Sequence, residues 1–287
     1  MAKEKVLIAV KTYPTLSKSH TETACTAGFH EDGSWIRLYP IPFRLLDGDK
    51  QYEKYQWVEV NTATNSKDPR PESRKVINID DITLLNKVET GKSRDWAERR
   101  RLILSKNKVY TNKDEIIQKA HANEISLVIF KPAKILDFVV ENADPDWEQD
   151  KVDGILNDLK QGDLFAEKSE EDFKLVRKLP YKFSYKFLDD AGKESTLMIE
   201  DWEIGQLYWN CEQHYGKDQA VAKVRQKYMD DFAKTKDLHL FLGTTFLHHV
   251  RRAKNPFVII GTFHPPHVTQ ESLLYRGLYL AVMPHEG

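Results

Sequence analysis

The sequence contains few cysteines and no long apolar run. Cys25 and Cys211 are its two cysteines and lie far apart in the chain. This scarcity argues against a disulfide framework and against a zinc site built on paired cysteines. The apolar run at residues 6–10 is too short for a signal peptide, and no segment approaches the length of a membrane-spanning helix. We therefore expect a cytoplasmic protein with no membrane partner.

The chain also lacks an excess of either charge, since 43 basic residues stand against 44 acidic ones. A nucleic-acid ligand would have to bind a local basic patch, because the whole molecule has no basic field. A glycine-rich phosphate loop, a nucleophile elbow and a dinucleotide fingerprint are all missing from the sequence. The late histidines, such as His264 and His267, do not have a metal-ligand spacing. We expect neither a metal nor a cofactor.

Short segments with strand character dominate the first 80 residues. They cover residues 6–10, 21–29, 35–39, 56–62 and 76–79. No helix intervenes to support parallel crossovers, so the pattern predicts an antiparallel, partly closed, barrel-like sheet. Helical patterns follow at 93–105 and at 111–122, where Thr111 is the expected cap, and strands at 125–130 and 135–140. The predicted class is α+β.

A charged stretch divides the chain. We expect a barrel-like part at 1–145 with the nucleic-acid site, a connection at 146–178, and an α/β part at 179–287 packed against the first. The last part should hold strands at 181–188, 195–199, 238–244 and 256–263, and helices at 201–216 and 217–233. Strands on both sides of the connection could join one sheet, which would make a single composite domain.

Arginines, aromatic residues and prolines are concentrated at 35–44 and 68–74. Guanidinium groups suit phosphate, and flat rings stack on bases, so these segments predict a nucleic-acid site. The expected nucleic-acid-binding residues are Lys11, Arg37, Arg44, Arg70 and Arg74, and the expected base-stacking residues are Tyr13, Trp35, Tyr39 and Phe43. The structural alternatives are an edge strand with snorkelling arginines, and a solvated loop with an internal ion pair to Glu72.

Two carboxylates are candidates for catalysis. Glu22 should open a strand beside the one that ends at Lys11, where it could act as a general base or stabilise developing positive charge. A surface ion pair is the alternative for this pair. Asp201 is the reserve catalytic carboxylate, although its position also suits a helix cap.

Several ordered motifs run along nearly the whole chain. They are Glu22-Thr23-x-Cys25-x-Ala27-Gly28, the segment Trp35–Arg44, Asp68-Pro69-Arg70-Pro71-Glu72-Ser73, Asp201-Trp202-Glu203-x-Gly205-Gln206-Leu207-Tyr208 and Ile259-Ile260-Gly261-x-Phe263-x-Pro265-Pro266. With these motifs the chain resembles a recurring prokaryotic family, some of whose members occur beside restriction or phage-defence genes. The resemblance implies a bacterial or archaeal cytoplasmic protein and favours DNA as the ligand. We also consider a protein partner from a defence locus. It carries over no catalytic residue.

Three functions fit these patterns. The first is a DNA glycosylase-like hydrolase that flips a modified base out of foreign DNA and removes it. The second is a non-catalytic reader of a modified base or single strand that recruits a nuclease. The third is a nucleotide-modifying enzyme, in which the same arginines would grip a mononucleotide phosphate.

Overall fold

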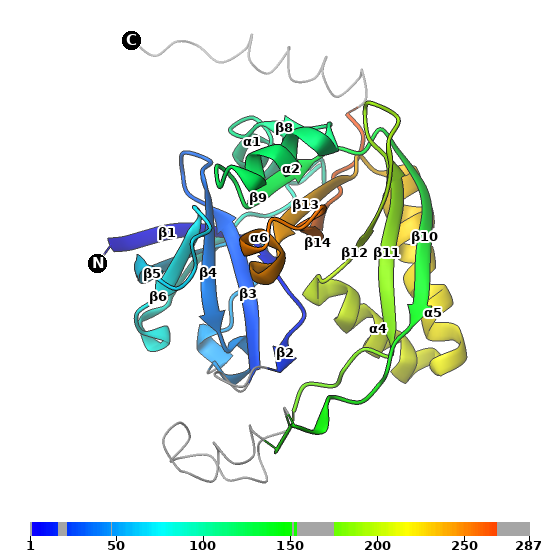
Figure 1. Ribbon diagram of the computed structural model, residues 1–287, viewed down its shortest axis with the longest axis horizontal. Coiled ribbons are helices and arrows are strands. Elements are labelled where there is room, and N and C mark those ends of the chain that lie inside the picture. Colours follow the sequence, from blue (N-terminus) through cyan, green and yellow to red (C-terminus); the bar gives the residue numbers. More distant parts are fainter. Residues whose placement is uncertain (1, 17–21, 47, 151, 154–174, 269–287) are drawn as a thin grey trace.

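The N-terminal third of the chain folds into a closed barrel (Figure 1). The computed structural model describes residues 2–16, 22–46, 48–150, 152–153 and 175–268. The barrel strands are β1 (Ala2–Lys11), β3 (Glu22–Phe29), β4 (Trp35–Ile41), β6 (Ser73–Val76) and β5 (Gln56–Thr64), and β5 pairs again with β1. The short strand β2 (Thr15–Leu16) pairs with β3, and β7 (Thr83–Lys87) pairs with β5. The predicted α+β class with a barrel-like N-terminal sheet is confirmed.

The fully apolar run in β1 reflects burial on both of its faces. Val6 and Ile8 belong to the cluster that fills the barrel. Leu7, Ala9 and Val10 belong to a second cluster, which joins the barrel to the rest of the molecule. A strand buried on both sides has no need of alternating polar residues.

One edge of the barrel differs from the expected sheet. β6 pairs with β4 in parallel, with Arg37 opposite Ser73, and it ends at Val76 where the sequence pattern placed a strand at 76–79. Asn78 ends the extended conformation, because its side chain accepts a hydrogen bond from the Asp80 amide and caps a 3₁₀ turn, Ile79–Asp81.

The rest of the chain builds two further sheets. One has four strands in the order β14 (Phe257–Phe263), β13 (His239–Thr244), β9 (Leu127–Phe130) and β8 (Val109–Tyr110). The other has three, β10 (Lys134–Asn142), β11 (Tyr181–Leu188) and β12 (Glu194–Met198). β9 pairs with β13, and β10 pairs with β11, so both sheets join residues from either side of the charged stretch at 146–178.

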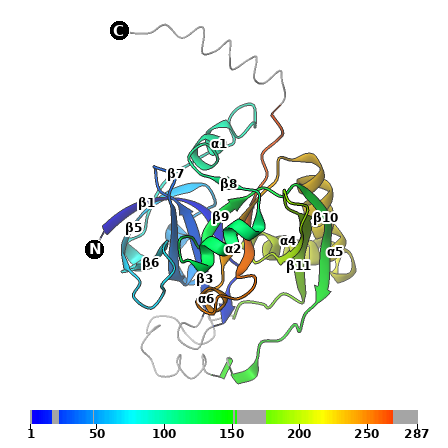
Figure 2. The same ribbon diagram turned by 45° about the horizontal axis from the view of Figure 1, so that its top comes forward.

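The α-helices in the described ranges are α1 (Ala97–Ile103), α2 (Lys113–His121), α4 (Trp202–Tyr215), α5 (Lys217–Arg225) and α6 (Phe246–Val250). α2 is capped by Asn112, whose side chain accepts from the Glu115 amide, while Thr111 bonds Asp190 instead of taking the predicted cap position. The predicted helix at 217–233 changes to π-helical geometry at Gln226–Ala233. α6 was not predicted and lies beside β3 in both views (Figures 1 and 2).

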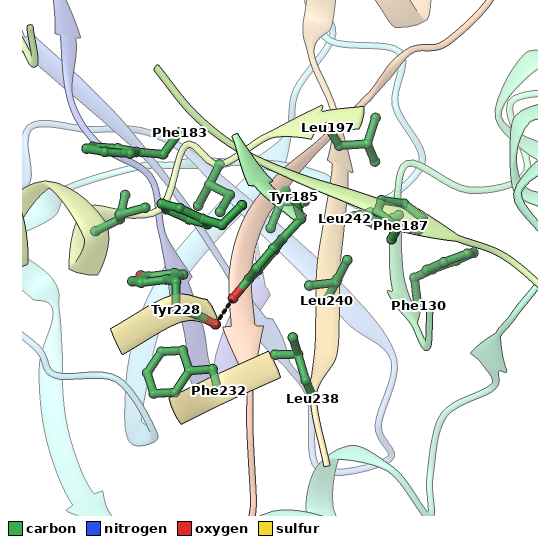
Figure 3. Packing of buried hydrophobic residues seen from close by; sticks show 14 of the residues in the cluster. Phe130, Phe183, Tyr185, Phe187, Leu197, Tyr228, Phe232, Leu238, Leu240 and Leu242 are labelled. Carbon is green, nitrogen blue, oxygen red and sulfur yellow. Dashed lines mark hydrogen bonds between the residues drawn. The ribbon is translucent and has the colours of Figure 1, made fainter. Parts of the chain in front are cut away.

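The largest apolar cluster fills the space between the two smaller sheets and their helices. Figure 3 shows its aromatic centre, where the Tyr185 hydroxyl donates to the Tyr228 carbonyl of the π-helical turn at 2.7 Å. The cluster that contains Leu7 and Phe241 lies between the barrel and the four-stranded sheet. The two parts of the molecule therefore share a core, and the cavities described next lie where they meet.

Candidate functional site

Two cavities lie where the end of β1 meets the chain that leads into α4. Thr12 pairs with Asp201 in an antiparallel bridge, and the Tyr13 amide donates to the Glu200 carbonyl at 2.7 Å. Adjacent residues of this backbone pair line different cavities. Lys11 and Asp201 line one, which we call the lysine cavity. Thr12, Tyr13 and Glu200 line the other, which we call the arginine cavity.

The arginine cavity has a volume of about 430 Å³. It is lined by Thr12, Tyr13, Thr15, Cys25, Arg37, Tyr39, Asn65, Lys67, Asp68, Arg70, Glu200, Thr244, Thr245, Phe246, Val258 and Ile260. Aromatic rings, aliphatic side chains and charged groups therefore share one hollow. The structure brings four of the residues singled out in the sequence together here: Arg37, Arg70, Tyr13 and Tyr39.

The two arginines of this cavity are held by protein atoms. Arg37, which is 2% exposed, donates to the Cys25 sulfur at 3.3 Å and to the Ser126 carbonyl at 3.2 Å. Burial lowers its pKa, and its Nε has no partner in the described part of the chain. Arg70, which is 7% exposed, pairs with Asp68 at 2.6 Å and donates to the Thr244 carbonyl at 2.7 Å.

These contacts join the barrel to the four-stranded sheet. Ser126 precedes β9 and Thr244 ends β13, so both arginines of the barrel side bond the second sheet. Glu72 accepts from the Ser126 amide at 2.8 Å, and the ion pair of the loop is Arg70–Asp68 where the alternative interpretation expected Glu72. The proline-rich loop thus has a structural role at the junction.

Other predicted site residues lie elsewhere. Arg74 donates to the carbonyls of Pro71 and Ser73, and neither it nor the half-buried Arg44 lines either cavity. Trp35 packs on Phe29 with ring centroids 4.0 Å apart and joins the core between barrel and sheet. The structure therefore does not bring these three side chains to the arginine cavity.

Tyr13 is positioned by α4. The Trp209 indole donates to the Tyr13 hydroxyl at 2.8 Å, and that hydroxyl donates to the Arg177 carbonyl at 2.6 Å. Gly205 leaves room for the ring, because a Cβ at that position would lie 2.2 Å from it. Gly205, in the motif that begins at Asp201, thus allows the Tyr13 ring to pack against α4.

Glu200 is a cavity residue that the sequence reasoning missed. Burial raises the pKa of its carboxyl, and among the residues described here that carboxyl makes no hydrogen bond or ion pair. Its only sequence signal is its place between the strand character of 195–199 and Asp201. Glu22 opens β3 and its backbone pairs with Leu16, but its side chain lies outside the described residues, so its catalytic role stays a prediction.

The lysine cavity is larger, at about 560 Å³. Its lining consists of Lys11, Glu53, Lys54, Tyr55, Lys87, Trp96, Arg99, Asp201, Trp202, Glu203, Gln206, Leu207, Asn210 and His264. The Lys11 ammonium lies 3.9 Å from the centre of the Phe43 ring and donates to the Tyr52 carbonyl at 3.1 Å. Burial, partly opposed by Glu203 and Asp201, lowers the pKa of Lys11 to about 8. Phe43 is thus a support for Lys11 inside the barrel.

Asp201 is the carboxylate of the lysine cavity. Its Oδ1 accepts from the Glu203 amide at 3.2 Å, which is the helix-cap role that the sequence suggested. Its Oδ2 is buried and has no partner in the described part of the molecule. Burial raises the pKa of Asp201 to about 7, although Lys54 opposes the shift. Lys54 itself pairs with Glu203 at 2.6 Å. A carboxyl and an amine that both titrate near neutral pH thus share one cavity, as they do at many catalytic centres.

Neither a membrane span nor a metal cluster occurs in the part of the chain that the structure describes. None of its helices is long and apolar enough to cross a bilayer. No group of three or more histidine, cysteine, aspartate or glutamate side chains within it could hold a metal ion.

Comparison with known proteins gives family matches and loose structural likenesses. No curated protein matches the sequence. A murine DNA-binding protein bound with double-stranded DNA is similar with a TM-score of 0.29 and 10% identity, over 94% of this chain and 98% of that one. A tetrameric HIN2 crystal structure is similar with a TM-score of 0.30 and 5% identity, over 93% and 92% of the two chains. The domain of unknown function DUF8758 matches residues 2–105. The domain of unknown function DUF8757 matches residues 109–277, and the chain belongs to that family.

Proposed function

We propose that this protein binds DNA, takes one base into the arginine cavity and hydrolyses the N-glycosidic bond of that base. The observation that carries the proposal is Glu200. It is a carboxyl with a raised pKa and no hydrogen bond within the described residues, and it lies in a cavity walled by aromatic rings. Perturbed carboxyls in clefts are candidates for acid–base chemistry.

The cavity suits a base in size and in lining. Its volume of about 430 Å³ lies within the usual range for small-ligand sites, roughly 300–1,000 Å³. Tyr13 and Tyr39 provide rings for stacking, and Val258 and Ile260 provide apolar contact. Lys67, which is exposed at the same cavity, is placed to bind a flanking phosphate.

The proposed reaction uses one water molecule. Ionised Glu200 takes a proton as the water oxygen bonds to C1′ of the sugar, and the C1′–N electron pair leaves with the base. The proton then passes from Glu200 to the departing nitrogen, which leaves a free base and an abasic sugar. The cations Arg37 and Arg70 favour the negative charge that develops on the base. The resemblance to prokaryotic proteins encoded near defence genes supports foreign, modified DNA as the substrate.

The test is release of a base from DNA. Purified protein is incubated with plain and modified duplexes, and alkali then converts abasic sites to strand breaks. We expect Glu200→Gln to reduce breaks by roughly 10²- to 10⁴-fold while DNA affinity changes little. Glu194→Gln is the matched control, because Glu194 of β12 is an exposed carboxylate that pairs with Lys186 of β11. DNA binding without base loss on every substrate would contradict hydrolysis and leave the reader function.

The lysine cavity favours a second candidate, a nucleotide-modifying enzyme that works through an amine. Lys11, with a pKa of about 8, is partly uncharged at neutral pH, and buried Asp201 can exchange a proton with it. Such an amine adds to a carbonyl carbon, and loss of water then gives an imine.

Borohydride reduction tests this second function. Ribose 5-phosphate and an abasic duplex serve as carbonyl probes, and mass spectrometry locates the adduct. Attachment at Lys11 that disappears in Lys11→Met and weakens in Asp201→Asn would support amine chemistry. An even distribution of the probe over exposed lysines would remove it.

A further inference from the structure

The one-turn helix α6 carries an unusual set of side chains for its size. Phe246, Leu247 and Val250 are 46%, 49% and 52% exposed. The other exposed large apolar side chains in the described residues, Ile77, Tyr215 and Val268, come from three separate segments. Water-exposed apolar side chains that cluster on one element mark a binding surface.

The segment that follows α6 is basic. Arg251, Arg252 and Lys254 are exposed, and their side chains form no hydrogen bond or ion pair with any residue that the structure describes. Arg252 adopts a left-handed backbone conformation, with φ of 48°, which turns the chain sharply after the helix. We call Phe246, Leu247, Val250, Arg251, Arg252 and Lys254 the α6 projection.

The α6 projection is anchored to the body of the protein. The buried His249 bonds the Thr244 hydroxyl at 3.1 Å and the Asn123 side-chain oxygen at 2.8 Å. The Thr245 side chain caps the helix by accepting from the His248 amide. His121 contacts the Ala253 carbonyl at 2.9 Å. The apolar side chains are therefore presented on a fixed support.

The projection is also continuous with the arginine cavity. Phe246 belongs to the lining of that cavity, and its ring centre lies 5.8 Å from the Arg70 guanidinium. Figures 1 and 2 show α6 between β3 and the four-stranded sheet. The cavity lining includes Cys25 of β3, Thr244 of β13 and Ile260 of β14. A ligand bound over the projection would reach the cavity directly.

We infer that the α6 projection is a wedge for double-stranded DNA, a role that rests on the proposed function. Phe246 and Leu247 enter the stack of bases, and Arg251, Arg252 and Lys254 bind the flanking phosphates. Apolar wedges beside basic side chains are how proteins unstack and kink a duplex. The exposed cations favour a polyanion as the ligand. The apolar side chains favour a polyanion that has stacked bases between which they can insert. The displaced base then has the adjacent arginine cavity to occupy.

Two variants separate the two halves of the wedge. Binding is measured by fluorescence anisotropy of a short labelled duplex, and unstacking by the emission of a 2-aminopurine within it. The charge variant, Arg251→Gln with Arg252→Gln and Lys254→Gln, should bind at least 10-fold more weakly at low salt. Its salt-dependence slope should fall by up to about 3, at roughly 0.9 for each lost phosphate contact.

The apolar variant, Phe246→Ala with Leu247→Ala, should keep its affinity to within about 3-fold because the phosphate contacts remain. It should, however, lose the rise in 2-aminopurine emission. Lys134→Gln with Lys182→Gln and Lys217→Gln removes the same charge from exposed residues of β10, β11 and α5, and it should behave as the unmodified protein. All of these sites are on the surface, and thermal melts confirm that each variant is folded.

The wedge role would be wrong if the charge variant had the same affinity and salt-dependence slope as the unmodified protein. It would also be wrong if the apolar variant still raised the 2-aminopurine emission. A preference for single strands with no unstacking of duplex would also overturn it. These readouts need no turnover, so they are repeated in Glu200→Gln. If unstacking is normal and no base is released by the unmodified protein, hydrolysis fails and the wedge stands. If base is released but α6 has no influence, the wedge alone fails.

Discussion

The two cavities differ in which of their charged groups are bonded within the protein. In the arginine cavity Arg70 is paired with Asp68, Arg37 is bonded to protein atoms except at its Nε, and the carboxyl of Glu200 makes no hydrogen bond or ion pair in the described residues. In the lysine cavity Lys54 is paired with Glu203, while Lys11 and the Oδ2 of Asp201 have altered proton affinity and no opposing ion pair among the residues described. A charge that is fully bonded within the fold stabilises it, whereas a buried group that lacks a partner is available to a ligand.

The largest effect should come from breaking the bonded charge pair of the arginine cavity. Asp68→Ala leaves the guanidinium of Arg70 buried without its partner, and removal of one member of a buried pair costs about 3–5 kcal/mol. Urea denaturation at pH 7 measures the free energy of unfolding. Glu98→Ala, which removes the partner of Arg101 from an exposed ion pair, is the comparison and should cost much less. Equal, small losses in both variants would show that the pair does not secure the junction.

The carboxylate of the lysine cavity should affect stability in a pH-dependent way. The pKa of Asp201 is about 7 in the folded protein against 3.8 for an unperturbed aspartate, so between these values the folded state holds a proton that the unfolded chain has released. Stability therefore falls as pH rises from about 4 to about 7. At about 1.4 kcal/mol for each pKa unit, ionising Asp201 costs at most about 4 kcal/mol.

Asp201→Asn removes that cost, since its side-chain oxygen can still cap α4. We expect the variant to gain stability over the unmodified protein at pH 8 and to match it near pH 4. Thermal melts at several pH values provide the measurement. A gain that is the same at every pH would mean that Asp201 ionises normally.

The strands could be predicted from the sequence better than the hydrogen-bond partners of the charged side chains. The run Val6–Val10 has the pattern of a strand buried on both faces, and the turn at Gly33 closes the hairpin of β3 and β4. Arg37, Arg70, Tyr13 and Tyr39, which the sequence singled out, line one cavity, and their part in binding nucleic acid stays a prediction. The arginine bonds to Ser126 and Thr244, however, span 89 and 174 positions of the chain, and no local pattern encodes such distances.

The site residues that the sequence did not identify are recognisable only from their surroundings in the folded protein. Glu200 is exceptional because of what surrounds it in space, since the isolated segment contains only an acidic residue next to another. α6 is a single turn between two strands, too short for helical periodicity to register. Its open apolar side chains become informative only when the burial of every other large apolar residue is known.

The amine of the lysine cavity should react as a weakly basic group. Labelling with an acylating reagent as pH is raised, followed by mass spectrometry, should give a midpoint near 8 for Lys11, because burial disfavours its charged form. Lys54 is the internal comparison. Burial opposes its charge, but Glu203, Tyr55 and Asp201 outweigh burial and raise its pKa, so it should label last. The reverse order of labelling would assign the reactive amine to Lys54 and exchange the two roles.

The smallest effect concerns Tyr13, a wall of the arginine cavity that follows the backbone pair Thr12–Asp201. Trp209→Phe keeps the ring in α4 but removes the indole donor to the Tyr13 hydroxyl, a loss of about 1 kcal/mol for one hydrogen bond. Tyr13 lines the arginine cavity alone, so DNA unstacking and base release should weaken while the labelling midpoint of Lys11 stays near 8. A parallel shift of the Lys11 midpoint would show that the backbone pair Thr12–Asp201 transmits changes between the cavities, and the two would then have to be treated as one site.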